Sequence, residues 1–235
     1  MHSKLYLIPN FLSEESSSAI ISNAVVDIVK NLRFFVVEDR ASAQRFLKKI
    51  WPSFPLGECS FLEFNEHSSS QDAREIFKSL QGKNAGMISE AGMPCVADPG
   101  QEIVLLAHQN NWEVIPLAGA SSIVLALAAS GLNGQNFAFN GYLPKAPEDR
   151  IKKLKALEER SLRENQTQIF METPYRNQAL LEGILNACHP KTLLCLAVDL
   201  TESDQYIKIY SIEEWRKLKP PLHKRPALFL LQKFR

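Results

Sequence analysis

A compact loop of small residues and prolines is the first place where this chain could bind a ligand. Ser89-Glu90-Ala91-Gly92-Met93-Pro94 is followed shortly by Asp98-Pro99-Gly100. Prolines preset the backbone, and Gly92 lets a ligand approach it closely, so backbone groups of this loop could hold a ligand. The same pattern also suits an ordinary strand-to-helix connection, and the loop alone leaves both interpretations open.

A second run of small residues, Ala118-Gly119-Ala120-Ser121-Ser122, opens a predicted helix directly after a strand. The free amide groups of a helix N-terminus, together with the two hydroxyls, could bind a carboxylate or hydroxyl groups. Tight packing of the helix on a sheet would require the same small residues, so a packing role is the alternative.

A third segment brings ionisable and aromatic side chains together. The apolar strand that ends at Met171 is followed by Glu172-Thr173-Pro174-Tyr175-Arg176. A carboxylate at the end of a strand, beside an aromatic ring and an arginine, is typical of a candidate active site. A surface ion pair between Glu172 and Arg176, of little energetic weight, is the alternative.

Short apolar runs that alternate with segments of helical periodicity position these three loops and predict an α/β protein. The predicted strands are residues 5–8, 34–37, 61–64, 84–89, 112–116, 137–142, 167–171, 192–198, 205–210 and 227–231. The predicted helices are residues 16–30, 41–50, 73–80, 98–109, 121–129, 147–162 and 173–187, with a short one after a Ser211–Glu214 capping box. Asp98 and Thr173, each followed by proline, are the expected N-caps of two of them.

Ligands of open α/β sheets bind beyond the carboxyl ends of the strands, so each of the three loops occupies a favourable position. The strand-rich stretch before residue 211 predicts a mixed sheet in the second half of the chain. We expect two domains, residues 1–117 and 118–235, because no flexible linker is present and residue 117 ends a strand.

Composition excludes several classes of function. The formal net charge is +1, so a nucleic-acid partner would need a local basic patch. The four cysteines and five histidines lack metal-ligand spacing, and we expect no metal site. No apolar stretch approaches the roughly 18 residues of a membrane span, so a cytoplasmic protein without membrane contact is expected. Neither a G-x-G-x-x-G motif nor a Walker lysine is present, which argues against dinucleotides and nucleoside triphosphates.

Four motifs, in this order, carry a family resemblance. They are GMISEAGMPCVADPG (residues 86–100), IPLAGASSIVLALAASGL (115–132), FNGYLPK (139–145) and ETPYR (172–176). The chain thereby resembles the tetrapyrrole methylase superfamily, and within it the branch of small-subunit ribosomal RNA cytidine 2′-O-methyltransferases. The corresponding motifs of that branch include Ser-Asp-Ala-Gly-Thr-Pro, Phe-x-Gly-Phe-Leu-Pro-Lys and Glu-Ser-Pro-His-Arg. The resemblance implies two α/β domains, S-adenosylmethionine bound in the cleft between them, and a homodimer.

The resemblance also implies site residues. The expected cofactor-binding residues are Pro9, Glu90, Ala91, Gly92, Met93, Pro94, Ser121, Ser122, Met171, Ala197, Pro226 and Ala227, of which Pro226 and Ala227 would line the adenine. Glu172 and Arg176 are the candidate catalytic residues. A ribose hydroxyl is a weak acid, so Glu172 could remove its proton, or could instead orient the substrate.

Three segments depart from the branch. Its Thr-Pro-Ile-Gly-Asn loop corresponds here to Pro9-Asn10-Phe11-Leu12, its Glu-Asp-Thr-Arg to Glu38-Asp39-Arg40-Ala41, and its Arg-Glu-Leu-Thr-Lys to Val198-Asp199-Leu200-Thr201-Glu202. Both basic residues of the last segment are replaced. Because these changes fall where substrate would bind, they bear on the substrate more than on the methyl donor.

The expected function is therefore methyl transfer from S-adenosylmethionine to RNA, at the ribose 2′-oxygen if the resemblance holds. The alternatives are methylation of a small molecule, as in relatives of the corrinoid pathway, and a non-catalytic relative that binds RNA or another ligand. Two basic clusters are expected to reach solvent and contact phosphates: Lys145, Arg150, Lys152, Lys153 and Lys155, and then Lys217, Lys219, Lys224 and Arg225. An ordinary solvated amphipathic helix explains the first cluster equally well.

Overall fold

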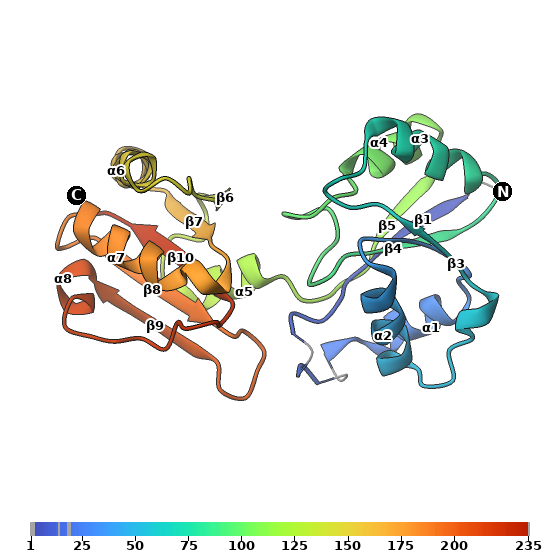
Figure 1. The fold of residues 1–235 in the computed structure, drawn as a ribbon, viewed down its shortest axis with the longest axis horizontal. Helices are drawn as coiled ribbons and strands as arrows, with labels where there is room; N and C mark the ends of the chain where they lie inside the picture. Colours follow the sequence, from blue (N-terminus) through green and yellow to red (C-terminus); the bar gives the residue numbers. More distant parts are fainter. Residues whose placement is uncertain (1–2, 14, 18–19, 235) are drawn as a thin grey trace. The chain divides into compact units, whose positions relative to one another are not determined.

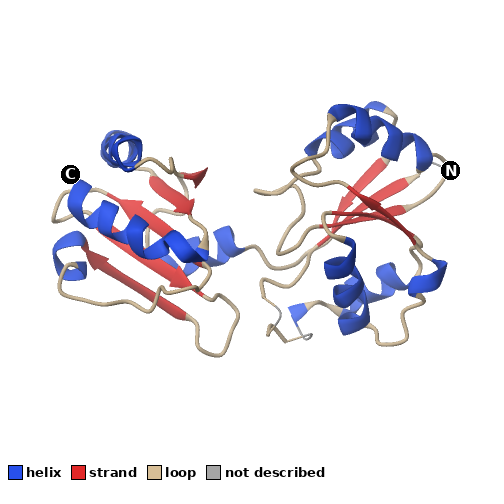
Figure 2. Cartoon of the chain, in the orientation of Figure 1, coloured by secondary structure: helices blue, strands red, loops and turns tan. Residues whose placement is uncertain are grey.

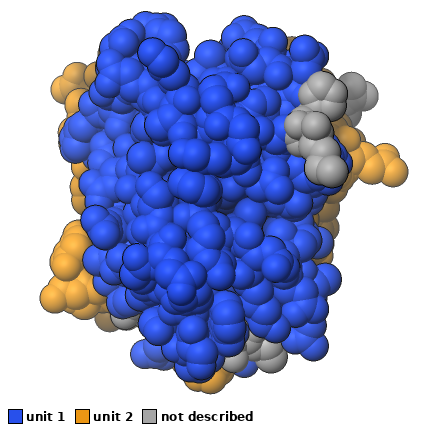
Figure 3. Space-filling view, turned by 90° about the vertical axis from the view of Figure 1, so that its right-hand side faces the viewer, with its two compact units in different colours: residues 1–121 blue, residues 122–235 orange. Residues whose placement is uncertain are grey.

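The computed structural model describes residues 3–13, 15–17 and 20–234 of the chain. The chain divides into two compact units, Met1–Ser121 (unit 1) and Ser122–Arg235 (unit 2), which Figure 3 colours separately. The boundary lies shortly after the one placed at residues 117–118 from the sequence.

Unit 1 is built on one parallel sheet (Figure 1). Its strands, in the spatial order β3-β2-β4-β1-β5, are β3 (Ser60–Glu63), β2 (Phe34–Val37), β4 (Ala85–Ile88), β1 (Lys4–Ile8) and β5 (Glu113–Pro116). All four pairings are parallel, so the carboxyl ends of the strands meet at one edge. The sheet therefore offers a single edge for loops that bind a ligand.

Helices cover both faces of this sheet (Figure 2). Helices α1 (Asn23–Lys30) and α2 (Arg40–Ile50) form one core with the sheet, in which Val29, Phe35 and Phe46 are buried. Helices α3 (Ser70–Ser79) and α4 (Gln101–Gln109) form a second core on the other side. A short 3₁₀ helix, η2 (Leu56–Glu58), precedes β3. Because both faces are covered, the central strand β4 is buried throughout, as its uninterrupted apolar sequence requires.

Unit 2 contains a mixed sheet, as the sequence predicted. In spatial order its strands are β6 (Phe137–Tyr142), β7 (Thr167–Met171), β10 (Ala227–Gln232), β8 (Leu193–Val198) and β9 (Tyr206–Ser211). Strands β6 and β7 are parallel, whereas β10 runs antiparallel to both of its neighbours and β9 runs antiparallel to β8. The start of β10 therefore lies beside the ends of β7 and β8.

Four α-helices accompany the described part of this sheet. Helices α6 (Pro147–Glu164), α7 (Asn177–Ala187) and α8 (Ile212–Trp215) pack on one core with Leu154, Phe170 and Trp215. Helix α5 (Ser122–Ser130) packs against β8, β9 and β10 outside that core. No helix in the described residues is long and apolar enough to span a membrane.

Four predicted helix starts are wrong, one of them that of α3, which begins at Ser70 and not at residue 73. Helix α4 begins at Gln101 instead of Asp98, because Gly100, with a φ of 123°, ends the loop and Asp98 bonds to Ser89. Thr173 makes no capping bond, and Pro174–Arg176 form the 3₁₀ turn η3 before α7. Helix α1 begins at Asn23, where the side chain of Ser22 caps it, and residues 18 and 19 of the longer predicted helix lie outside the described residues. The Ser211–Glu214 capping box is confirmed.

Candidate functional site

The carboxyl edge of the unit 1 sheet brings two of the predicted ligand loops together. Asn10, directly after β1, is buried and donates from its side-chain amide to the carbonyl oxygens of Ser89 (2.8 Å) and Glu90 (3.0 Å). Its backbone amide donates to the carbonyl of Gly92 at 2.8 Å. The loop after β1 and the loop after β4 are thus fixed to each other, and Pro9 lies at their junction. Sequence reasoning did not single out Asn10, although a polar residue directly after a strand was the available signal.

The third loop at this edge, which follows β5 and contains Gly119, packs closely against Pro9. A Cβ on Gly119 would lie 2.2 Å from Cβ and Cγ of Pro9, so only glycine fits there. Gly92 has a φ of +69°, and a Cβ on it would come within 3.2 Å of Leu12 and 3.5 Å of the carbonyl oxygen of Ala120. Packing therefore accounts for Gly119, while both loops converge on the segment that starts with Pro9.

Carboxylates line the same edge. Glu38, after β2, accepts a hydrogen bond from the backbone amide of Glu90 at 3.2 Å. Together with Ser89 and Pro94 it borders a cavity of about 10 Å³, enough for roughly one water molecule. Burial, and to a lesser extent the charges of Glu38 and Glu90, raise the pKa of Asp98 to about 6, although a hydrogen bond with Ser89 opposes the shift. Burial likewise raises the pKa of Glu38. Perturbed carboxyl groups of this kind are common at functional sites.

In unit 2 the cofactor residues suggested by the resemblance are strand neighbours. On β10, Leu228 pairs with both Met171 of β7 and Ala197 of β8, and Ala227 pairs with Val198. The carbonyl of Pro226 accepts a hydrogen bond from the amide of Asp199 at 3.0 Å. Met171, Ala197, Pro226 and Ala227 therefore lie at one edge of the sheet, and Ser122 begins α5 in the same unit.

The pair formed by Glu172 and Arg176 is buried on the glutamate side. The Glu172 side chain is 1% exposed, and its Oε1 accepts from the Thr173 amide (2.7 Å) and from Nη2 of Arg176 (2.5 Å). The Arg176 side chain keeps 34% of its surface exposed. Among the described residues, Oε2 of Glu172 and Nε of Arg176 have no hydrogen-bond partner although both atoms are buried. The alternative of an ion pair at the surface therefore does not hold for Glu172, which is buried.

A second ion-pair network stands beside this one. Asn177 is fully buried and donates from its amide to the carbonyl of Arg225 at 2.7 Å. The Arg225 guanidinium bonds to the carboxylate of Asp199 and to that of Asp204, the latter at 2.9 Å. Neither Asn177 nor Asp199 was predicted as part of the site, although Asp199 directly follows the strand β8.

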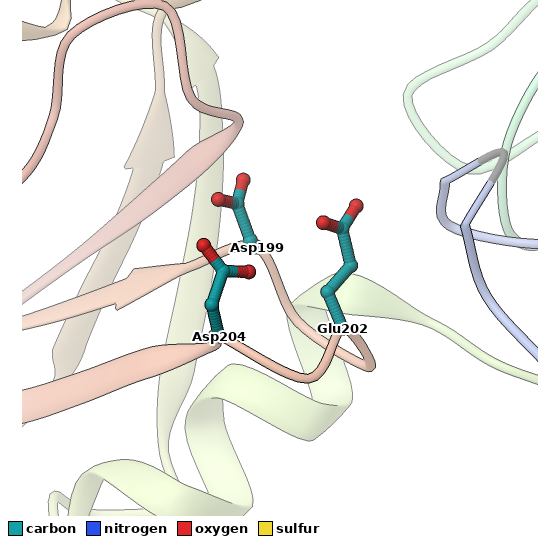
Figure 4. Close-up of side chains that lie close together, drawn as sticks. All are labelled: Asp199, Glu202 and Asp204. Atoms are coloured by element: carbon teal, nitrogen blue, oxygen red, sulfur yellow. The ribbon is translucent and has the colours of Figure 1, made fainter.

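Asp199, Glu202 and Asp204 come from the loop between β8 and β9, with oxygens within 4.8 Å of one another (Figure 4). Three carboxylates at such distances could bind a metal ion. Arg225 already supplies positive charge to two of them, so we interpret the cluster as part of this ion-pair network.

Two of the predicted phosphate-binding arginines do not reach solvent freely. Arg150 is only 9% exposed, because it occupies the buried stripe of α6 together with Leu154 and Leu157, and its Nη1 donates to the carbonyl of Lys145 at 3.4 Å. Arg225 is held by the two aspartates. The lysines of both clusters are exposed: Lys145, Lys152, Lys153, Lys155, Lys217, Lys219 and Lys224.

Comparisons with known proteins identify the family of this chain. Residues 19–215 match the family described as Tetrapyrrole (Corrin/Porphyrin) Methylases. A Ribosomal RNA small subunit methyltransferase I from Vibrio cholerae is 29% identical over 87% of this chain and 67% of its own length. A protein of the same name from Bacillus subtilis is 32% identical over 77% of this chain and 58% of its own length. The chain thus matches only part of the length of these relatives.

Solved structures share the fold. The methyltransferase CobJ superposes with a TM-score of 0.63 at 15% identity, covering 99% of this chain and 94% of its own. The uroporphyrin-III C-methyltransferase from Thermus thermophilus in complex with S-adenosylhomocysteine gives a TM-score of 0.54 at 15% identity, with 98% of each chain covered. The two α/β units and the match over most of the sequence lead to one conclusion: this chain belongs to the tetrapyrrole (corrin/porphyrin) methylase family.

Proposed function

We propose that this chain is an S-adenosylmethionine-dependent methyltransferase that methylates RNA, at the 2′-oxygen of a ribose. The observation that carries the proposal is the similarity, over 87% and 77% of the chain, to two proteins named Ribosomal RNA small subunit methyltransferase I. Such a substrate would place the protein in the cytoplasm. The departures after β1, β2 and β8 leave open which nucleotide is modified.

The residues at the two sheet edges suit the methyl donor. S-adenosylmethionine supplies a methyl group already activated by its sulfonium, so the protein has to align donor and acceptor and to let the acceptor oxygen lose its proton. The loop of Glu90 to Pro94 would hold the polar end of the donor through backbone groups. The carboxylates of Glu38 and Asp98 fit a ligand of net positive charge, and Pro226 and Ala227, at the start of β10, would line the adenine.

Burial and pairing favour a positioning role for Glu172. A general base must touch the group that it deprotonates, whereas the Glu172 side chain is 1% exposed and ion-paired with Arg176. Through these bonds Glu172 fixes the turn that carries Tyr175 and the partly exposed Arg176. We therefore propose that Arg176 contacts the substrate and that Glu172 orients it.

The test is methyl transfer from labelled S-adenosylmethionine to ribosomal RNA, followed by digestion to nucleosides. We expect 2′-O-methylated nucleosides from the wild type, with lower yield as salt increases. Label found only in a small-molecule acceptor would reject RNA as the substrate. Absence of label in every acceptor would reject the proposed methyltransferase activity.

The Glu172→Gln variant tests the role of Glu172 in the same assay. We expect kcat/KM for RNA to fall about tenfold while the pH profile of kcat keeps its shape, because no proton passes through a positioning group. The control is Glu182→Gln, the same change at an exposed position of α7. Loss of the basic limb of the pH profile, together with a fall in kcat of a hundredfold or more, would identify Glu172 as the general base instead.

We also infer a homodimer, as the family resemblance implies. Helix α5 is apolar on all sides, and its Val124 and Leu125 are 58% and 38% exposed, which suits a surface that a second copy covers.

A further inference from the structure

Tyr175 is the most exposed large apolar side chain of unit 2 in the described residues, at 78%. A single exposed aromatic ring is common on protein surfaces and needs no explanation alone. The backbone beneath this ring, however, is held by hydrogen bonds. Pro174 restricts the preceding residue, and both flanking residues of the turn are tied to Glu172, whose Oε1 binds the Thr173 amide and the Arg176 guanidinium. The ring is thus displayed on a rigid turn.

A cation lies against this ring. Nζ of Lys224 stands 5.7 Å from the centroid of Tyr175, within the range of a cation–π interaction. Lys224 belongs to the segment before β10, which is anchored by its neighbour: the Arg225 guanidinium bonds to Asp199 and Asp204, and the Arg225 carbonyl accepts from Asn177. The hydrogen bond between Asn177 and Arg225 joins the turn of Tyr175 to the segment of Lys224.

Two ion-pair networks lie beside the ring. Arg176 neutralises Glu172, and Arg225 faces Asp199 and Asp204. Lys224 lies against the ring, and the partly exposed Arg176 follows Tyr175 in the same turn. A fixed aromatic face flanked by cations is the arrangement with which proteins hold single-stranded RNA, because any base can stack on the ring while the phosphates contact the cations.

We propose that Tyr175 and Lys224 form a stacking platform for one unpaired base of the RNA substrate, with Lys224 and Arg176 beside its phosphates. The inference rests on the proposed RNA methyltransferase function and names the residues that hold the substrate. Because hydrogen bonds hold the turn that carries the ring before binding, little backbone entropy is lost when a base stacks on it. The platform stands at the same sheet edge as Met171 and Ala227, so it would hold the RNA near the residues assigned to the donor.

The experiment measures binding of a fluorescein-labelled single-stranded RNA oligonucleotide to the full chain with S-adenosylhomocysteine present. Tyr175→Ala should raise the Kd for RNA about tenfold, the size of one lost base stack, while Tyr175→Phe should stay within twofold of the wild type. Lys224→Gln should weaken RNA binding several-fold and lower its salt dependence. The Kd for S-adenosylhomocysteine should not change in any of the three variants. Phe137→Ala is the matched control, because it removes another exposed ring, at the start of β6 and so away from the sheet edge where β7 ends.

A second measurement separates stacking from a general loss of structure. Tyr175→Trp should keep RNA affinity, and its added tryptophan emission should be quenched by the oligonucleotide but not by inorganic polyphosphate. Unchanged RNA affinity in Tyr175→Ala, with normal methylation of RNA, would overturn the platform and leave the proposed function intact. If the wild type neither binds nor methylates RNA, the platform and the proposed function both fail. If Tyr175→Ala instead impairs binding of a protein, the platform is a protein contact and the inference is wrong.

Discussion

Asp98 and Glu172 are both carboxylates near the ends of buried strands, but their surroundings differ. Glu172 has the Arg176 guanidinium and a backbone amide as partners. Asp98 has a hydrogen bond with Ser89 and faces the like charges of Glu38 and Glu90, so burial and repulsion raise its pKa to about 6. In the folded chain an ionised Asp98 is therefore costly, whereas Glu172 is held in place by its partner.

The raised pKa of Asp98 predicts a pH dependence of stability. From about pH 4 to pH 6 the unfolded chain releases this proton while the folded chain retains it, so the free energy of unfolding falls as the pH rises through this window. Asp98→Asn should remove that fall. The variant should match the wild type near pH 4 and be more stable by about 1 kcal/mol at pH 7, after allowance for solvent screening.

Urea denaturation of both proteins across this pH range measures the difference. Glu63→Gln, at an exposed position of the same unit, is the control and should not alter the pH dependence. A stability difference between Asp98→Asn and wild type that is the same at every pH would contradict the prediction.

At the scale of the elements, periodicity predicted the strands and most helices because each depends on which local residues are apolar. The errors lie where distant groups decide. Asp98 does not cap α4, because Ser89, at the other end of the same loop, binds its carboxylate. Arg150 was placed in solvent because an arginine rarely faces a core, although it precedes Leu154 and Leu157 at i+4 and i+7 and so shares their buried stripe. The sequence shows which residues recur at the helical period, but the groups packed against them decide which are buried and where a helix starts.

The capping box of α8 predicts a measurable local stability. The Ser211 hydroxyl accepts from the Glu214 amide, and the Glu214 carboxylate accepts from the Ser211 amide at 2.8 Å. This four-residue helix places the fully buried Trp215 in the core of unit 2. Ser211→Ala should lower the free energy of unfolding by about 1 kcal/mol, because a helix amide loses its partner.

Chemical denaturation followed by tryptophan fluorescence checks this value. Ser203→Ala, which changes a serine in an exposed turn, should leave the stability of the chain unaltered. An equally stable Ser211→Ala variant would show that the packing of Trp215 alone holds α8 in place.

For the whole molecule, we expect two copies in solution. Light scattering at micromolar concentration should give about twice the 26.5 kDa of one chain. Val124→Glu should shift the mass toward the monomer, because it puts a charge on the exposed apolar side of α5. Ala128→Glu makes the same test at another exposed position of the helix. A monomeric wild type would contradict the inference.

Only part of the candidate site could be predicted from the sequence. Motif order indicated the family and the loops after β4, β5 and β7. The contacts that join those loops could not be deduced, because they link residues that are far apart in the chain: Asn10 to Ser89, Gly119 to Pro9, and Asn177 to Arg225. The first two join a recognised motif to the segment after β1, and the third joins the residue after the ETPYR motif to the segment before β10.

Strand β10 lies between β7 and β8 although it follows both of them in the chain. On the ribosome, unit 1 has all its strands once β5 has emerged, and it can fold while synthesis continues. Unit 2 cannot pair β7 with β8 through β10 until residues 227–232 have been translated. Until then β7 and β8 each keep an open edge that could pair with another chain. The interval before β10 is translated is therefore when unit 2 depends most on protection from pairing with other chains, for example by a chaperone.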